Sequence, residues 1–118
     1  MPEKKNYDVI ILGTGPAGLQ AAIHAARKKV SVLVLGKETR SSLFHAHIEN
    51  FCCIFNITGE EILKAGRQQA ANFGADLLEE DVLNILPQGP HFKIISESGT
   101  ELTCKSLIVA TGTARNNK

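Results

Sequence analysis

No two of the three cysteines in this sequence are separated by two residues. Cys52 and Cys53 are adjacent, and Cys104 lies far from both. Neither a C-x-x-C redox dithiol nor the paired spacing of a zinc site is therefore present. Adjacent cysteines are also poorly placed to bridge each other. We expect three reduced thiols that pack as small hydrophobic side chains.

The sequence also lacks long apolar runs and clusters of one charge. The first residues, Met-Pro-Glu-Lys-Lys-Asn, do not contain the apolar core of a signal peptide, and no run is long enough to cross a bilayer. The net charge is +1, from 13 basic and 12 acidic residues, and no basic cluster indicates nucleic acid. These absences predict a cytoplasmic protein that binds neither nucleic acid nor membrane.

The composition is that of an ordinary globular domain, with 43% hydrophobic and 21% charged residues. A chain of 118 residues can bury the core of one domain but not of two. No repeat, low-complexity segment or linker divides it. We therefore predict a single domain over residues 1–118.

The stretch from Tyr7 to Glu38 is the most informative part of the sequence. An apolar run at 9–12 is followed by three glycines spaced G-x-G-x-x-G, then by an alanine-rich segment and a second apolar run at 32–35. The pattern predicts a strand over 7–12, a helix over 16–28 and a second strand over 31–35. The unbroken apolar runs are typical of strands that are covered on both faces, as in a parallel sheet.

Each glycine of this motif has a physical role in a dinucleotide site. Gly13 allows a tight turn, Gly15 lets a pyrophosphate approach the backbone, and Gly18 lets the helix pack close to the strand. The unpaired N–H groups and the dipole at the start of the helix favour a diphosphate, and Pro16 suits the first helical turn. The strand, turn, helix and second strand together favour dinucleotide binding over a glycine turn in a protein without a nucleotide.

An acidic residue about 20 positions after the motif usually binds the adenosine ribose. Glu38 has this spacing from Gly18, although the residue that ends the second strand is Gly36.

The second half of the chain predicts one more helix and several short strands. Thr58 and Glu61 form a capping box that opens a helix running to Asn72, and Gly74 is well placed to end it. Its apolar side is expected to consist of Ile62, Gly66, Gln69, Ala70 and Phe73, with Leu63 beside them. Strands are predicted over 76–79, 82–86, 92–96 and 101–104, of which the last three form a meander, and a final buried strand over 106–110.

These elements predict an α/β protein with a Rossmann-like FAD/NAD(P)-binding fold, built on a parallel sheet with a β-meander on the crossover. We expect no catalytic nucleophile or general base. His24 is expected to pack against its helix rather than to bind a ligand. His45 and His47 are expected to lie in an exposed loop or near a cofactor, because no further residue has the spacing of a metal ligand.

Five segments resemble the N-terminal part of the FAD domain of the thioredoxin reductase family, within the flavoproteins that bind two dinucleotides. The likeness covers nearly the whole chain. The segments are YDVIILGTGPAGLQAAIHAAR from Tyr7, LVLGKE from Leu33, HIENF from His47, ITGEEIL from Ile57 and IVATGTA from Ile108.

The resemblance implies that the cofactor is FAD and assigns its contacts residue by residue. The pyrophosphate would face Gly13, Gly15, Pro16 and Ala17; the adenosine ribose would meet Gly36, Lys37 and Glu38; the ribityl and flavin would lie along Ser42, Leu43 and Asn50; the adenine would meet the backbone of Val82; and Ala110, Thr111 and Gly112 would pass near the adenosine half.

The sequence departs from the family pattern in two ways. Cys52 and Cys53 stand where the family tends to have a proline–glycine turn. The sequence also stops shortly after Gly112, before the closing strand, the nicotinamide domain and the redox dithiol of the family. We therefore expect a partial FAD-binding domain of a thioredoxin-reductase-like flavoprotein oxidoreductase that is not catalytically complete by itself.

Two other interpretations stay open: a non-catalytic Rossmann-fold module that acts as an assembly partner, and an NAD(P)-binding domain. A sheet without its closing strand leaves an edge or an apolar face uncovered. We therefore expect a homo-oligomer, with a dimer first, or a complementing chain.

Overall fold

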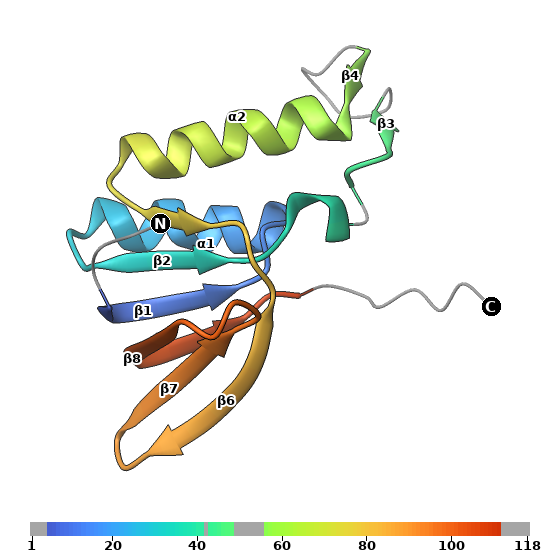
Figure 1. Cartoon of the computed structure of the whole chain (residues 1–118). Coiled ribbons are helices and arrows are strands. Elements are labelled where there is room, and N and C mark those ends of the chain that lie inside the picture. The colour runs from blue at the N-terminus through green and yellow to red at the C-terminus, as the bar shows by residue number, and fades with distance from the viewer. Residues whose placement is uncertain (1–4, 42, 49–55, 112–118) are drawn as a thin grey trace.

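A computed structural model describes residues 5–41, 43–48 and 56–111 of the chain. Two helices cover one face of the parallel part of a six-stranded sheet, and the β-hairpin over residues 82–96 forms the end of that sheet farthest from the helices (Figure 1). The helices are α1 (Pro16–Arg27) and α2 (Gly59–Asn72). The sheet has the order β5 (Asp76–Leu78), β2 (Val32–Leu35), β1 (Asn6–Leu12), β8 (Glu101–Val109), β7 (His91–Ser96) and β6 (Val82–Gln88).

The shorter elements lie between β2 and α2. A 3₁₀ turn, η1 (Glu38–Arg40), follows β2, and a two-stranded ribbon consists of β3 (His47–Ile48) and β4 (Ile57–Thr58). The elements predicted before residue 80 are confirmed, with ends that differ by one or two residues.

The parallel half of the sheet is built around β1 and β2, whose apolar runs are buried on both faces. β2 and β8 both run parallel to β1, and β5 runs parallel to β2. Ile10, paired with Leu33, points to one face, and Ile11, paired with Val34, points to the other; all four side chains are fully buried. The prediction of a Rossmann-like parallel sheet is confirmed.

The prediction of separate strands over 101–104 and 106–110 is wrong, because β8 is one continuous strand. Lys105 interrupts the apolar pattern of the sequence but not the hydrogen-bonded ladder. The first half of β8 pairs antiparallel with β7 up to Cys104, and β8 also pairs parallel with β1 from Thr103 to Val109. The meander and the parallel strands therefore form a single sheet.

The far half of β8 is also more exposed than its apolar sequence predicts. Ile108 is 38% exposed and Val109 is 64% exposed. Among the residues that the structure describes, no strand pairs with β8 beyond Cys104 on the side opposite β1. Within the described ranges, the end of β8 therefore has an unpaired edge and exposed side chains, unlike a strand buried inside a parallel sheet.

The capping box of α2 is confirmed. The Glu61 backbone N–H donates to Thr58 Oγ1 over 3.2 Å, and the Thr58 N–H donates to Glu61 Oε1 over 3.2 Å. Gly74 follows the helix with a φ of +104°, the left-handed conformation that glycine adopts most easily at this position.

The predicted apolar side of α2 is partly wrong. Leu63 and Ala70 are buried, whereas Gln69 is exposed and Phe73 is 47% exposed. The two helices approach closely at Gly66, where an added Cβ would lie 3.0 Å from Leu19 Cδ1. This close approach centres the buried stripe on the residues around Gly66, so the Phe73 ring is left outside, 5.6 Å from the Arg27 guanidinium.

The expected packing of His24 is also wrong. α1 buries Gly18, Leu19, Ala22 and Ala26, which follow the helical period of about 3.6 residues. His24 lies outside this stripe and is exposed. The expectation for Cys104 is confirmed, since its thiol is free and almost fully buried.

Tyr7 connects two strands that are not neighbours. Its Oη donates to Asp76 Oδ2 over 2.7 Å, from β1 to β5 with β2 between them. The side chain is only 3% exposed. Burial first, and then the hydrogen bond and the charge of Asp76, raise the pKa of the phenol well above its ordinary value of 10.0.

We predict that alkaline pH destabilises the protein through Tyr7. The folded state holds the phenol proton more tightly than the unfolded chain does, so the contribution is complete below pH 10.0 and is lost as the pH rises above it. Tyr7 is the only tyrosine, so the ultraviolet absorbance of phenolate reports this residue alone and should rise together with unfolding measured by circular dichroism. Titration of Tyr7 in the folded protein at its ordinary pKa would contradict this prediction.

Candidate functional site

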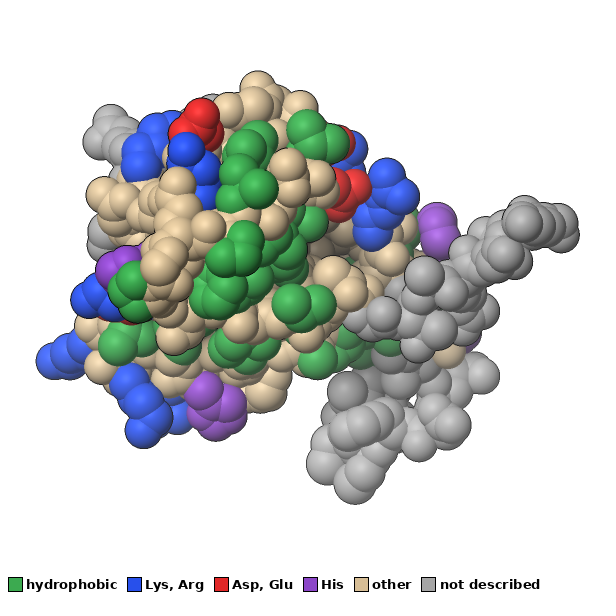
Figure 2. Space-filling model, turned by 90° about the horizontal axis from the view of Figure 1, so that it is seen from below, with side chains coloured by type: hydrophobic (Ala, Val, Ile, Leu, Met, Phe, Trp, Pro, Cys, Tyr) green, Lys and Arg blue, Asp and Glu red, His purple; other side chains and the backbone are tan. Residues whose placement is uncertain are grey.

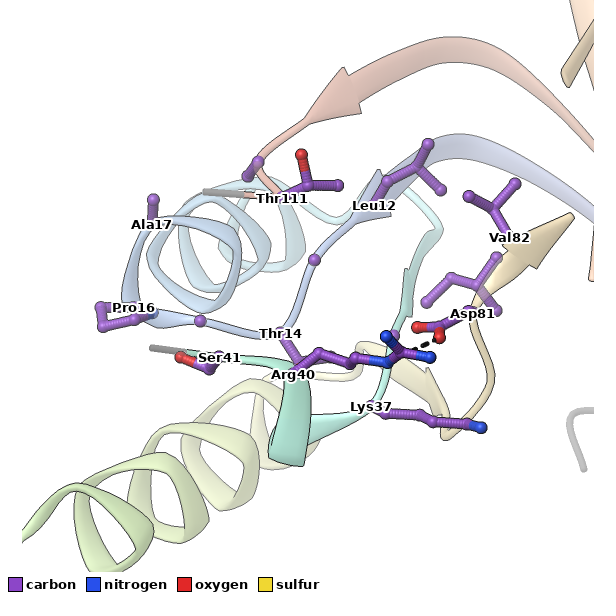
Figure 3. Close-up of a pocket in the computed structure, with 15 residues that line it drawn as sticks. Leu12, Thr14, Pro16, Ala17, Lys37, Arg40, Ser41, Asp81, Val82 and Thr111 are labelled. Carbon is purple, nitrogen blue, oxygen red and sulfur yellow. Dashed lines mark ion pairs between the residues drawn. The ribbon is translucent and has the colours of Figure 1, made fainter. Parts of the chain in front are cut away.

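A cavity of about 420 Å³ opens where the carboxyl ends of β1, β2 and β8 meet the start of α1 (Figure 3). The loop that carries η1 and the turn that leads into β6 complete its wall. Ligands of open parallel sheets bind in crevices at this edge. The cavity is the first candidate site because the glycine motif of the sequence lies in its wall.

The backbone around Gly13 is packed as a tight turn requires. Gly13 has a φ of +117°, and its N–H donates to the Leu35 carbonyl over 2.9 Å. An added Cβ would lie 2.2 Å from the Ala110 carbonyl oxygen. The ends of β1, β2 and β8 therefore meet at a point where only glycine fits.

Gly18 and Gly15 differ in what surrounds them. An added Cβ at Gly18 would lie 2.0 Å from the Gly13 carbonyl oxygen, so α1 can approach β1 only because this side chain is absent. At Gly15, φ is −78° and the nearest atom to an added Cβ is Ser41 Oγ at 3.2 Å. A side chain at Gly15 would therefore project at the wall of the cavity, whereas one at Gly18 would clash within the packed turn.

The start of α1 presents unpaired backbone donors to the cavity. Gly15 caps the helix without a side-chain hydrogen bond, Pro16 occupies the first turn, and no acidic residue lies in that turn. Gly15, Pro16 and Ala17 line the cavity. The positive end of the helix dipole and the free N–H groups make this wall suited to an anion.

Thr14 supplies a polar group that the described residues leave without a partner. Its side chain is buried, and Oγ1 has no hydrogen-bond partner among them. Leaving a buried hydroxyl without a hydrogen bond costs stability. Because this hydroxyl belongs to a residue of the cavity wall, a bound ligand could supply the missing partner.

Two ion pairs lie at the other end of the cavity. Arg40 Nε is 3.1 Å from Asp81 Oδ2, and Lys37 Nζ is 2.8 Å from Glu97 Oε1. The hydrogen bond and charge of Glu97 raise the pKa of Lys37, so the ammonium stays charged at neutral pH. Figure 3 shows the Arg40 side chain extending across the cavity to Asp81, whereas Lys37 points away from the glycine turn.

Glu38, the acid predicted for the ribose, does not line the cavity. Its carboxylate Oε2 accepts from Arg67 NH1 over 3.2 Å, and the same guanidinium binds Glu79. The side chains of Arg67 and Glu38 are 23% and 18% exposed, so this network ties the loop after β2 to α2 and to the end of β5.

Nine of the predicted cofactor residues come together in the wall of the cavity. They are Gly13, Gly15, Pro16, Ala17, Gly36, Lys37, Val82, Ala110 and Thr111. Leu43 does not line it and packs instead against the core beneath the helices. Ser42, Asn50 and Gly112 lie outside the described residues. Ligand contacts at all of these positions stay predictions.

The sequence analysis missed six lining residues: Leu12, Thr14, Leu35, Arg40, Ser41 and Asp81. Leu12, Thr14 and Leu35 are direct neighbours of predicted residues, and Asp81 precedes Val82, so proximity to the motif could have found them. Arg40 had no signal of this kind, because its place in the cavity depends on the course of η1.

The histidines and cysteines do not gather into a metal site within the described residues, where no group of three or more potential ligands is found. His45 and His47 are both exposed, but His47 lies on β3 and not in a loop; the His45 ring makes an edge contact with Phe44 at 4.8 Å between centroids. Cys52 and Cys53 lie outside the described residues. No helix in the described part of the chain is both long and apolar enough to cross a membrane.

Comparison with known proteins gives a consistent set of matches. Residues 7–118 match the family model described as pyridine nucleotide-disulphide oxidoreductase. The chain is 36% identical, over 92% of its length, to a bifunctional thioredoxin reductase/thioredoxin of Mycobacterium leprae, and 37% identical, over 92%, to a thioredoxin reductase of Aquifex aeolicus. It superposes on a thioredoxin reductase structure from Gloeobacter violaceus with a TM-score of 0.88 and 28% identity over 98% of the chain.

The chain spans less than half the length of each of these relatives. The chain spans 24% of the Mycobacterium leprae protein, 34% of the Aquifex aeolicus protein and 40% of the Gloeobacter violaceus chain. The fold therefore has counterparts in longer proteins.

We predict that alanine is tolerated at Gly15 but not at Gly18. An added methyl at Gly18 meets the Gly13 carbonyl and should lower the free energy of unfolding by about 3 kcal/mol, whereas at Gly15 the Ser41 side chain can move and the loss should stay below about 1 kcal/mol. Urea unfolding of Gly18→Ala and Gly15→Ala tests this difference. Equal losses would show that the turn is not as tightly packed as described.

Proposed function

Because the chain belongs to the pyridine nucleotide-disulphide oxidoreductase family, we propose that residues 1–118 form part of the FAD-binding domain of a thioredoxin-reductase-like flavoprotein oxidoreductase. The observation that supports FAD most directly is the cavity at the start of α1. It combines a glycine turn, unpaired helix donors and the unpartnered Thr14 hydroxyl in one wall.

The residues of the cavity suit the phosphate and adenosine part of FAD. The diphosphate would lie against Gly15 and Ala17, where the backbone donors and the helix dipole stabilise its charge. The adenosine would extend toward Gly36 and Val82 at the far end of the cavity, past Ala110 and Thr111. Bound FAD would supply the redox chemistry, and the protein would hold and orient it.

The flavin end would lie toward the loop after η1, where the family likeness places Ser42, Leu43 and Asn50. Of these, the structure describes only Leu43, which packs under the helices.

We do not assign the complete reaction of the relatives to this chain alone. Reduction of a disulfide by a flavoenzyme needs a redox-active group beyond the flavin, and the sequence contains no C-x-x-C dithiol. In this proposal the chain binds the flavin in the cytoplasm, and turnover depends on groups outside these residues.

A role as an assembly partner is the second candidate, and the exposed apolar side chains of β6 and β8 favour it. Leu83 is 70% exposed, and Ile85, Leu86, Ile108 and Val109 are exposed as well. Successive residues of a strand point to opposite faces, so these side chains are divided between the two faces of the sheet. Figure 2, seen from the side of these strands, shows hydrophobic side chains gathered in the middle of the face with charged ones around them. Patches of this kind mark contact surfaces, so we expect a homodimer or a complementing chain to cover it.

We predict that the purified protein binds FAD and that Gly15→Val abolishes the binding, because the valine side chain would occupy the path of the diphosphate. Quenching of flavin fluorescence during titration measures the affinity. Ala65→Val adds similar bulk on the exposed side of α2 and should bind like the wild type. Unchanged affinity in Gly15→Val would place the flavin elsewhere, and no quenching by the wild type would favour the assembly role.

We also predict that the protein sediments as a dimer and that Leu83→Lys with Val109→Lys shifts it to a monomer, because charged side chains on the covered face would have to be desolvated. Val30→Lys, at an apolar position that is 39% exposed but on neither β6 nor β8, serves as the control. A wild-type protein that is monomeric at all working concentrations would exclude the homodimer.

A further inference from the structure

Arg40 places a cation inside the cavity at a position with no role in the site described above. The residue after it, Ser41, lies beside Gly15, since its Oγ is the nearest atom to an added Cβ there. The Arg40 side chain extends across the cavity to Asp81 (Figure 3). The arginine therefore starts next to the helix donors and crosses the space that a dinucleotide would occupy.

The partner that holds Arg40 in this position is weakly bound. The Arg40 side chain is 71% exposed and contacts Asp81 through Nε at 3.1 Å. Exposed ion pairs of this kind contribute little to stability, because water and salt screen them and the side chains lose freedom. The guanidinium can thus exchange Asp81 for a more highly charged partner at little cost.

A diphosphate is such a partner. The charged side chains that line the cavity are Lys37, Arg40 and Asp81, and Lys37 is already engaged by Glu97 at 2.8 Å. Arginine binds phosphate oxygens with two parallel hydrogen bonds, which makes the contact stronger and more directional than a single contact to a carboxylate. A diphosphate at the start of α1 would lie beside the loop from which Arg40 extends.

We propose that Arg40 is a diphosphate-binding residue of this site and that Asp81 holds it when no ligand is bound. When the dinucleotide enters, the guanidinium leaves Asp81 and binds the phosphates from the loop after β2. Asp81 acts as a competitor for the guanidinium and not as an acceptor for the ribose. This inference rests on the proposed function, because it needs an adenine dinucleotide in the cavity.

The contrast with Arg67 supports a separate role for Arg40. Arg67 is largely buried between Glu38 and Glu79, with two carboxylates for one guanidinium, and none of these three residues lines the cavity. Arg40 has one carboxylate, is mostly exposed and lies in the cavity. The first arrangement holds the loop in place, and the second leaves a cation free to move.

The test compares FAD, ADP and adenosine binding to the wild type and to Arg40→Gln. Loss of a charged hydrogen-bonding partner should weaken FAD and ADP binding about tenfold and leave adenosine binding unchanged. FAD is followed by fluorescence quenching, and the other two ligands by calorimetry. Arg27→Gln removes the same charge at the far end of α1 and should bind all three like the wild type.

Asp81→Asn distinguishes the proposal from a role of Asp81 in binding the ribose. Removing the competing carboxylate should tighten ADP binding about threefold and have no effect in the Arg40→Gln background. Weaker ADP and adenosine binding by Asp81→Asn would make Asp81 a ribose acceptor and overturn the proposal.

The remaining outcomes also decide the matter. Wild-type protein that binds FAD and ADP, together with Arg40→Gln that binds them equally well, would overturn the role of Arg40 and leave the proposed function intact. Wild-type protein that binds neither FAD nor ADP would overturn both. If Arg40→Gln lowers the melting temperature, Arg40→Lys replaces it, and that variant should retain part of the ADP affinity because it keeps the charge without the paired donors.

Discussion

The structure depends on the contact of three backbone segments at the carboxyl end of the parallel strands. The Gly13 carbonyl fills the space where a Gly18 side chain would be, and the Ala110 carbonyl fills the space beside Gly13. These contacts bring the end of β1, the first turn of α1 and the end of β8 within van der Waals distance. The helix donors face an open cavity only because the backbone on their other side is packed this closely.

The rest of the cavity is supplied by loops that are held from behind. The Arg67 guanidinium binds Glu38 and Glu79 and so fixes the loop after β2 against α2. That loop then brings Arg40 and Ser41 to the mouth of the cavity. The residues that line the cavity and the residues that hold the loop are thus different. The sequence alone does not show that Glu38 and Glu79 hold the loop while Asp81 lies in the cavity.

The sequence predicts the first half of the fold well because its signals are local. The glycine spacing, the two apolar runs and the capping box each lie within a few residues of the structure that they specify. The continuity of β8 was missed because Lys105 breaks the apolar pattern, whereas the pairing with β1 and β7 that carries the strand through comes from distant parts of the chain. The meeting of Arg40 with Asp81 was missed for the same reason, and Glu38 has the expected spacing but its carboxylate points to Arg67.

One consequence follows from the uneven pairing of β8. Its residues near Cys104 lie between two strands, whereas those near Val109 pair only with β1 in the part of the chain that the structure describes. In the first part, successive backbone amides are protected by one or the other of the two neighbouring strands, whereas in the second part only the amides that face β1 are held in a ladder. Within β8, the end that leads into Ala110 is therefore less protected than the part around Cys104, and deuterium exchange should be faster in the wall of the cavity than in the middle of the strand.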